Sequence, residues 1–144
     1  WMQEKPSSVF LAATANRIQQ LPAELMRKGR FDQLFFLNLP TKQERMQIFR
    51  IHIALNGGDP SGFDISYMAA ATKGWSGAEI EQAIKSARVD AYQEDRSFDE
   101  KDVMRNTINM VPLSKTMGEQ IQAIKDWSFN RAVPASKPAP ANLQ

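Results

Sequence analysis

Three polar side chains near the start of the sequence have the types and positions of groups that act on a phosphorylated ligand. Asn16 follows the apolar run Val9–Thr14, and Arg27 and Arg30 lie in the basic segment RKGR. An amide can orient an attacking water without taking up a proton, and a guanidinium is a permanently charged, planar set of donors for a transferred phosphoryl group. The alternatives are an Asn that bonds to the backbone of a turn and a basic loop that is solvated or paired with acids.

The segments around these residues predict the end of a parallel sheet. The run Val9–Thr14 is too short to span a membrane and has the composition of a strand buried on both faces. A second apolar run, 34–39, predicts another strand that stops at Pro40, and 21–26 is compatible with a short helix. Ligands of open α/β sheets bind beyond the carboxyl ends of the strands, so Asn16 would lie where it can touch a substrate.

This arrangement resembles AAA ATPases. The second half of the ATPase domain in that family has a strand ending in Asn, two arginines three residues apart before Phe-Asp, and a strand ending in Pro. The matching features here are Asn16, the motif RKGRFD and the segment LNLP, and the eleven residues from Asn16 to Arg27 also fit the family. Within the family, the sequence is most similar in appearance to the AAA proteins encoded by cyanobacterial and algal chloroplast genomes.

The resemblance implies an activity, cofactors and partners. It implies that ATP is bound with Mg²⁺ and hydrolysed in a ring, expected to be a hexamer, to remodel or regulate a protein partner. Asn16 would be the residue called sensor 1, and Arg27 and Arg30 would act on the nucleotide of the neighbouring subunit. It also implies a location in the bacterial cytoplasm, or in the chloroplast stroma if the gene is in a plastid.

Three further residues are candidates for contact with the nucleotide. His52 lies near the end of a predicted helix, at a position where the family commonly has histidine, and could bond to adenine or ribose. Gly77 and Ala78 lie in GWSGAEI, which matches the family's sensor 2 region, and their small side chains would let a base or ribose approach a helix N-terminus. The alternatives are a surface or packing histidine and an ordinary helix start. Many relatives place an arginine in this helix; this sequence has Ala78.

Two features that nucleotide hydrolysis needs are absent from the sequence. There is no G-x-x-x-x-G-K-[ST] loop to hold phosphates, and no apolar strand ends in paired acids that could hold Mg²⁺. The family carries both ahead of the region that resembles this sequence. We therefore expect the chain to be part of a longer polypeptide, with the Mg²⁺ ligands upstream, and to be inactive on its own.

The composition argues against several other classes of function. The net charge of +2 is too small to indicate nucleic-acid binding by itself. The absence of cysteine and the presence of a single histidine argue against a thiolate or histidine-rich metal site. No apolar run approaches the roughly 20 residues of a membrane span.

Beyond Pro40 the sequence predicts helices. Thr41–Glu44 and Ser76–Glu79 are capping boxes, the first opening a helix to about residue 55. The second opens a helix with a buried stripe of Ile80, Ala83, Ile84, Ala87 and Ala91. Asp64 and Asp99 are expected to cap helices that end near 71 and 109. Thr116 is expected to cap a last helix with Ile121, Ile124 and Trp127 on one side.

The predicted fold class is therefore α/β followed by all-α. Residues 1–40 would be the C-terminal part of a parallel-sheet P-loop NTPase subdomain, residues 41–131 a helical lid subdomain, and residues 132–144 a Pro/Ala-rich tail without fixed structure. Two alternative functions remain open. One is a helical interaction module without catalytic function, and the other is nucleic-acid binding through the basic loop, which a steep dependence of affinity on salt would reveal.

Overall fold

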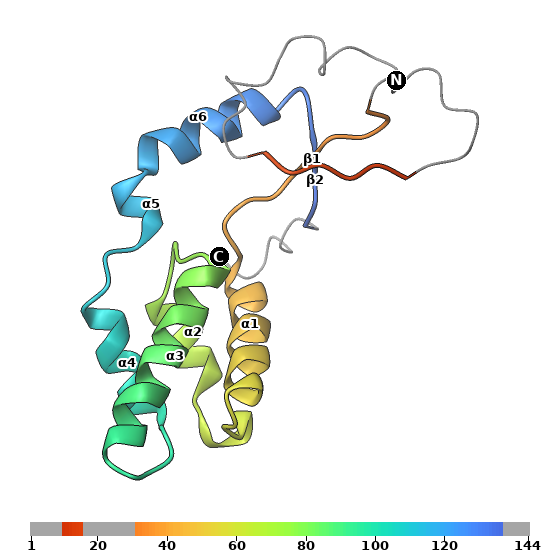
Figure 1. Ribbon diagram of the computed structural model, residues 1–144. Helices are drawn as coiled ribbons and strands as arrows, with labels where there is room; N and C mark the ends of the chain where they lie inside the picture. Colours follow the sequence, from red (N-terminus) through yellow and green to blue (C-terminus); the bar gives the residue numbers. More distant parts are fainter. Residues whose placement is uncertain (1–9, 16–30, 137–144) are drawn as a thin grey trace.

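The computed structural model describes residues 10–15 and 31–136, and within these ranges the protein is mainly helical (Figure 1). Four helices pack together, and the chain then leads away from them and returns to a small parallel strand pair. In chain order the elements are β1 (Phe35–Phe36), α1 (Lys42–Leu55), the 3₁₀ helix η2 (Pro60–Gly62), α2 (Ile65–Ala71), α3 (Gly77–Gln93), α4 (Glu100–Ile108), α5 (Leu113–Thr116), α6 (Gly118–Ser128) and β2 (Val133–Pro134). We call residues 42–108 the helical unit and residues 113–136 the return arm.

Helix α1 begins and ends where the sequence predicts. Thr41 Oγ1 accepts a hydrogen bond from the Glu44 N–H at 3.3 Å, and Glu44 Oε2 accepts one from the Thr41 N–H at 2.7 Å. This capping box satisfies two backbone donors that a helix start would otherwise leave unpaired. At the other end, Asn56 is followed by Gly57 with φ +86°, a left-handed conformation that costs glycine little.

Helix α3 is the centre of the helical unit and packs against both α1 and α4. The predicted stripe is confirmed, because Ile80, Ala83, Ile84, Ala87 and Ala91 are all fully buried. They meet Phe49 and Ile53 of α1, Met68 of α2 and Val103 of α4 in one hydrophobic core. Full burial of a side chain as large as Phe49 or Ile53 contributes about 1.5–3 kcal/mol to folding.

The predicted caps of the two shorter helices are also confirmed. Asp64 accepts a hydrogen bond from the N–H of Tyr67 at 2.9 Å, and Asp99 accepts one from the N–H of Asp102 at 3.0 Å. The start of α2 is further linked to α4, because the Asp64 N–H donates to Glu100 Oε2 at 2.6 Å.

The prediction for the last helix was wrong at its start. Thr116 does not cap α6: it is the last residue of the short helix α5, and its hydroxyl donates back to the Leu113 carbonyl at 3.4 Å. Met117 stands at the N-cap of α6 without a side-chain cap. The predicted apolar side is present but weakly covered, since Ile121, Ile124 and Trp127 are half-buried.

The strands are shorter than the apolar runs predict. Residues 10–15 form no strand and are exposed, with Phe10 93% exposed, and the run 34–39 contributes Phe35–Phe36 alone. A buried parallel strand needs neighbours on both edges, and in the described ranges β1 has one partner, β2. That partner lies inside the stretch predicted as a tail without fixed structure. None of the helices in residues 10–15 and 31–136 is long and apolar enough to cross a membrane.

Candidate functional site

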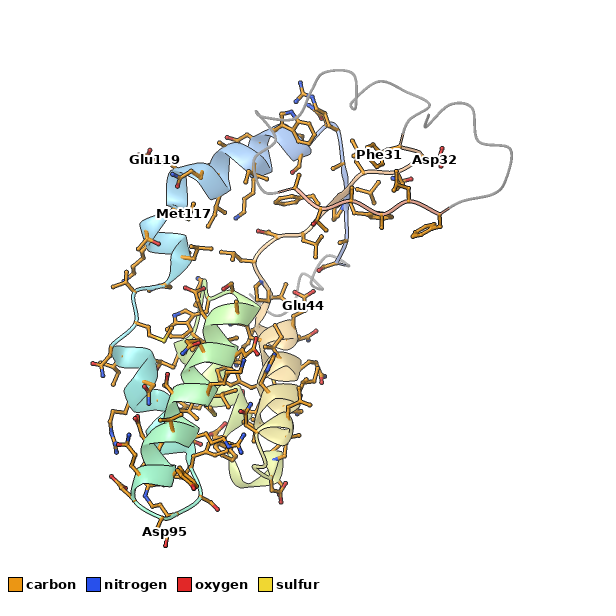
Figure 2. All side chains as sticks on the ribbon, in the orientation of Figure 1. Phe31, Asp32, Glu44, Asp95, Met117 and Glu119 are labelled. Atoms are coloured by element: carbon orange, nitrogen blue, oxygen red, sulfur yellow. The ribbon has the colours of Figure 1, made fainter. Side chains whose placement is uncertain are left out.

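The predicted site residues divide into two groups. Asn16, Arg27 and Arg30 lie outside the described residues, so their predicted roles stay predictions. Of the RKGRFD motif, Phe31 and Asp32 are described, and they lie beside the strand pair (Figure 2). The other group lies in the helical unit, with His52 in the last turn of α1 and Gly77 and Ala78 in the first turn of α3.

The packing of α1 against α3 sets the start of α3 beside the middle of α1. A methyl group at the Cα of Gly77 would stand 3.6 Å from Cδ1 of Ile48, one turn before His52. The start of α3 therefore rests on α1 at the turn before the imidazole. Because Gly77 has no side chain, another group can approach the backbone of α3 closely at this residue.

The first turn of α3 has the polarity of an anion-binding helix start. Ser76 Oγ accepts from the Glu79 N–H at 3.3 Å, and Glu79 Oε2 accepts from the Ser76 N–H at 2.6 Å. Within the described ranges, the N–H groups of Gly77 and Ala78 have no hydrogen-bond acceptor. Unpaired amides and the positive end of the helix dipole both favour an electron-rich or anionic group at this point.

A charged pair continues this junction one turn further along α3. Lys85 Nζ lies 2.6 Å from Glu81 Oε1. The hydrogen bond and the charge of Lys85 lower the pKa of Glu81. His52, which is half-buried, lies on α1 one turn after Ile48, the residue that faces Gly77. His52, Gly77 and Ala78 thus lie along one junction, with an imidazole on one helix and small residues on the other.

The described residues offer no metal site. No group of three or more His, Asp or Glu side chains in residues 10–15 and 31–136 could hold a metal ion. The groups available at the α1–α3 junction for binding are backbone amides, an imidazole and a small-residue surface.

Arg45 is a buried polar residue that the sequence reasoning missed. It lies at the joint between Pro40 and the helices α1 and α2. It is 5% exposed, and its guanidinium donates to backbone oxygens: Nε and Nη2 to Ala69 at 3.0 and 2.9 Å, and Nη1 to Pro40 at 2.6 Å. Burial lowers the pKa of Arg45, although a guanidinium stays charged. The signal was available, because Arg45 falls on the same four-residue spacing as the buried Phe49 and Ile53.

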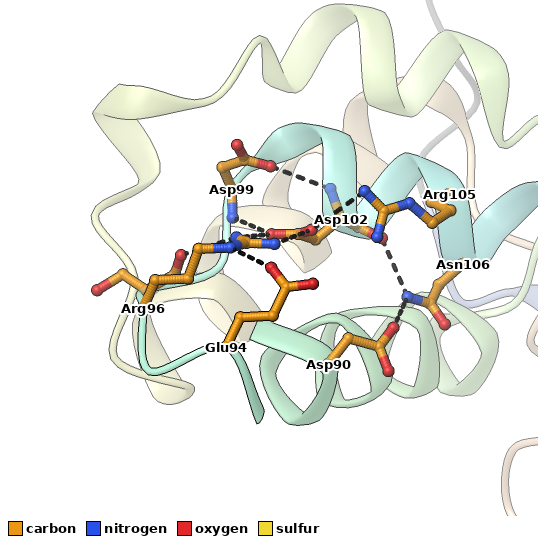
Figure 3. Close-up of polar contacts among 8 residues, drawn as sticks. Asp90, Glu94, Arg96, Asp99, Asp102, Arg105 and Asn106 are labelled. Carbon is orange, nitrogen blue, oxygen red and sulfur yellow. Dashed lines mark hydrogen bonds and ion pairs between the residues drawn. The ribbon is translucent and has the colours of Figure 1, made fainter. Parts of the chain in front are cut away.

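A second network closes the far end of the helical unit (Figure 3). The Arg96 guanidinium donates to both carboxylate oxygens of Asp102, at 2.6 and 2.8 Å, and to Glu94 at 2.7 Å. Asp102 is 1% exposed, and the Arg96 hydrogen bonds hold its pKa far below the ordinary aspartate value. The network fixes the loop between α3 and α4, on the side of the unit away from the strand pair.

Comparison with known proteins identifies the helical unit. Residues 62–105 match the family described as the AAA+ lid domain. The chain is 46% identical over 131 residues to the AAA domain-containing protein ycf46 of Gracilaria tenuistipitata, a match that covers 90% of this chain and 27% of that protein. The corresponding protein of Guillardia theta is 41% identical over 129 residues, with 89% and 26% covered.

A relative at lower identity is a metalloprotease. The ATP-dependent zinc metalloprotease FtsH of Parabacteroides distasonis is 32% identical over 105 residues, a match that covers 73% of this chain and 15% of that protein. The chain spans about a quarter of the length of the algal relatives it matches. The part of the chain that matches the lid-domain family includes helices α2 and α3, and α3 carries Gly77 and Ala78.

Proposed function

Because this chain belongs to the AAA family and carries an AAA+ lid domain at residues 62–105, we propose that it works as the lid-bearing part of an ATPase. ATP would bind against the α1–α3 junction, and its hydrolysis would move the helical unit. The observation that carries the proposal is the closeness of Gly77, which lies within the matched residues 62–105, to Ile48, one turn before His52 on α1.

The junction fits the adenosine end of ATP. The half-buried imidazole of His52 can exchange a hydrogen bond with a base or ribose, and the glycine at residue 77 leaves room for close approach. The N–H groups of Gly77 and Ala78, which have no acceptor among the described residues, favour an electron-rich ring edge. Bound ATP would supply the phosphoryl group, and the described residues would bind and orient its adenosine part.

The catalytic groups would come from residues outside the described ranges. Asn16 would orient the attacking water, and Arg27 and Arg30 would stabilise charge on the phosphoryl group of a neighbouring subunit in a hexameric ring. The described residues offer no Mg²⁺ site, so the ligands of Mg²⁺ would lie in other parts of the protein. We propose a protein partner as the object of remodelling or regulation, and the cytoplasm or the stroma as the location.

The proposal is tested with the protein expressed from its complete gene. Gly77→Ala adds a methyl group at an ordinary contact distance from Ile48, so we expect the melting temperature to hold and the Kd for ATP to rise at least tenfold. Gly118→Ala is the matched control, because Gly118 also begins a helix and has nothing within 4 Å of an added methyl. Equal ATP affinity in the two variants would remove the nucleotide from the α1–α3 junction.

The ring arrangement needs a separate variant. In the same protein, Arg30→Ala is expected to abolish ATP turnover while the Kd for ATP changes little, because the arginine would act on the neighbour's nucleotide. Lys28→Ala is the control in the same loop. Loss of ATP binding in Arg30→Ala would contradict the action in trans.

A helical interaction module without catalysis is the second candidate. The weakly covered apolar side of α6, with Ile121, Ile124 and Trp127 half-buried, favours it. A complete protein that binds no ATP would leave this candidate in place.

A further inference from the structure

We propose that the helical unit is attached to strand β1 at both of its ends, and that its movement during ATP turnover has to open the pair between β1 and β2. The inference rests on the proposed function for the source of that movement. The attachment itself is read from the contacts of the joint and of the return arm.

The pair joins residues on either side of the whole helical unit. The Val133 N–H donates to the Leu34 carbonyl at 2.9 Å, and the Ala135 N–H donates to the Phe36 carbonyl at 2.9 Å. Phe35 stands opposite Val133 in a parallel register. The chain therefore leaves β1, forms the helical unit and comes back to β1 through the return arm, as Figure 1 shows.

The first attachment is the segment between β1 and α1. Its end at Pro40 is held firmly on the helical unit, whereas residues 37–39 are not. Arg45 binds the Pro40 carbonyl and the Ala69 carbonyl together, so Pro40 moves with α1 and α2. Between Pro40 and β1, residues 37–39 make no backbone hydrogen bond to another described element, and Leu37 is 77% exposed. A rotation of the helical unit relative to β1 therefore takes place at residues 37–39.

The second attachment runs through the return arm. Its start moves with the helical unit, because Glu79 Oε1 accepts from the Leu113 N–H at 2.6 Å and Gly74 lies close against Ser114. Its end is held on β1 by the two hydrogen bonds above. A parallel strand points the same way as its partner, so residues after β2 head towards the start of α1.

A contact at the start of α1 supports this direction. The nearby Ser136 side chain is the largest of the causes that lower the pKa of Glu44. Figure 2 places Glu44 at the end of the helical unit that faces the strand pair. The end of the return arm and the start of the helical unit thus lie close together, next to residues 37–39.

Because of this geometry, rotation of the helical unit has to break the hydrogen bonds between β1 and β2. Rotation at residues 37–39 carries the start of the return arm with the helical unit, while β1 holds its end. The pair has two ladder hydrogen bonds and lies at the surface, with Phe35 62% and Val133 46% exposed. The core contacts of the helical unit are far more extensive, so the pair opens first.

Disulfide formation between the strands tests the proposal. The chain has no cysteine, so Phe35→Cys with Val133→Cys gives a defined pair in the complete protein once any cysteines elsewhere are replaced by serine. Phe35→Cys with Phe129→Cys is the control, because Phe129 is 84% exposed and lies outside the strand register. The rate of oxidation is measured without nucleotide, with ADP and with a non-hydrolysable ATP analogue, and ATP binding is measured separately.

We expect the strand pair to cross-link at least tenfold faster than the control, and its rate to change at least fivefold between nucleotide states. A rate equal to the control overturns the attachment. A rate that is the same in all states while ATP binds overturns the coupling and leaves the proposed function intact. A protein that binds no ATP contradicts the proposed function itself, and with it the coupling.

A second pair of variants tests the ladder directly. Ala135→Pro removes the N–H that donates to Phe36, whereas Ala135→Val keeps it and suits a strand. In the cysteine-bearing protein we expect cross-linking to slow at least fivefold in Ala135→Pro and to persist in Ala135→Val. Equal rates would show that the hydrogen bonds do not hold β2 on β1.

Discussion

The helical unit and the return arm are built in opposite ways. Helices α1, α3 and α4 each begin with a reciprocal capping box and share one buried core. Helices α5 and α6 begin without a side-chain cap and bury no large apolar side chain. Ser128 is the buried residue of α6. The helical unit is therefore specified by its own sequence, whereas the return arm depends on contacts at its two ends.

This difference teaches where independent stability resides. Helices shorter than about 12 residues are marginal in water unless tertiary packing supports them. The α1–α4 core supplies that packing, and α6, with 11 residues, has half-buried contacts alone. We expect the return arm to open at a lower free energy than the helical unit.

The largest expected effect comes from two phenylalanines of opposite burial. Phe49 is fully buried in the core and Phe129 is 84% exposed in the return arm. Phe49→Ala should lower the free energy of unfolding by about 3–5 kcal/mol, because it removes apolar contacts and leaves a cavity. Phe129→Ala should change it by less than about 0.5 kcal/mol. Denaturant unfolding of the chain measures both, and similar losses would break the comparison.

The next largest effect is a dependence of the free energy of unfolding on pH. It comes from the Asp102–Arg96 pair of the helical unit. Because the Arg96 guanidinium lowers the folded-state pKa of Asp102, this carboxylate stabilises the fold above the ordinary aspartate pKa of about 4. Its contribution is lost as the pH falls below that value. Asp102→Asn should therefore flatten the dependence of stability on pH between pH 6 and pH 2.

The control for this variant is Asp95→Asn at the tip of the same loop (Figure 2). Asp95 is exposed and has φ 53°, a conformation that asparagine also accepts. Urea unfolding at several pH values compares the two variants with the parent chain. An unchanged slope in Asp102→Asn would mean that the Arg96 pair adds nothing to stability.

The smallest expected effect separates a true cap from a false one. Thr41 caps α1, and Thr116 has the sequence of a cap but lies inside α5. Thr41→Ala should cost about 1 kcal/mol, as for typical N-caps. Thr116→Ala should stay within about 0.5 kcal/mol of the parent chain. Thermal unfolding measures both, and an equal cost would restore Thr116 as a cap.

The same contrast explains what the sequence could predict of the fold. Capping boxes and the 3.6-residue stripe are local signals, and at Thr41, Ser76 and Asp99 they placed the helices correctly. The start of α6 was missed because Pro112–Thr116 form a separate short helix, α5, with Pro112 at its N-cap. The apolar runs at 9–14 and 34–39 carry the composition of strands, but pairing depends on neighbours that a local pattern does not contain.

For the candidate site, the helix boundaries placed Gly77 and Ala78 at a helix start, and the packing set this start against Ile48 of α1, one turn before His52. The roles of Asn16, Arg27 and Arg30 stay predictions, because they lie outside the described residues. Arg45 escaped prediction because a basic residue on a helix is normally solvated. The acceptors of its guanidinium are 5 and 24 residues away, and this distance hides them from local patterns.

The bonding of Arg45 has a consequence for how this joint tolerates change over evolution. Its guanidinium donates to main-chain oxygens of Pro40 and Ala69, and these oxygens exist whatever side chain occupies either position. A salt bridge in the same place would require two residues to change together. Here one arginine maintains the contact, so the surrounding sequence can drift within the size limits of the core while Pro40 keeps its position against α1 and α2.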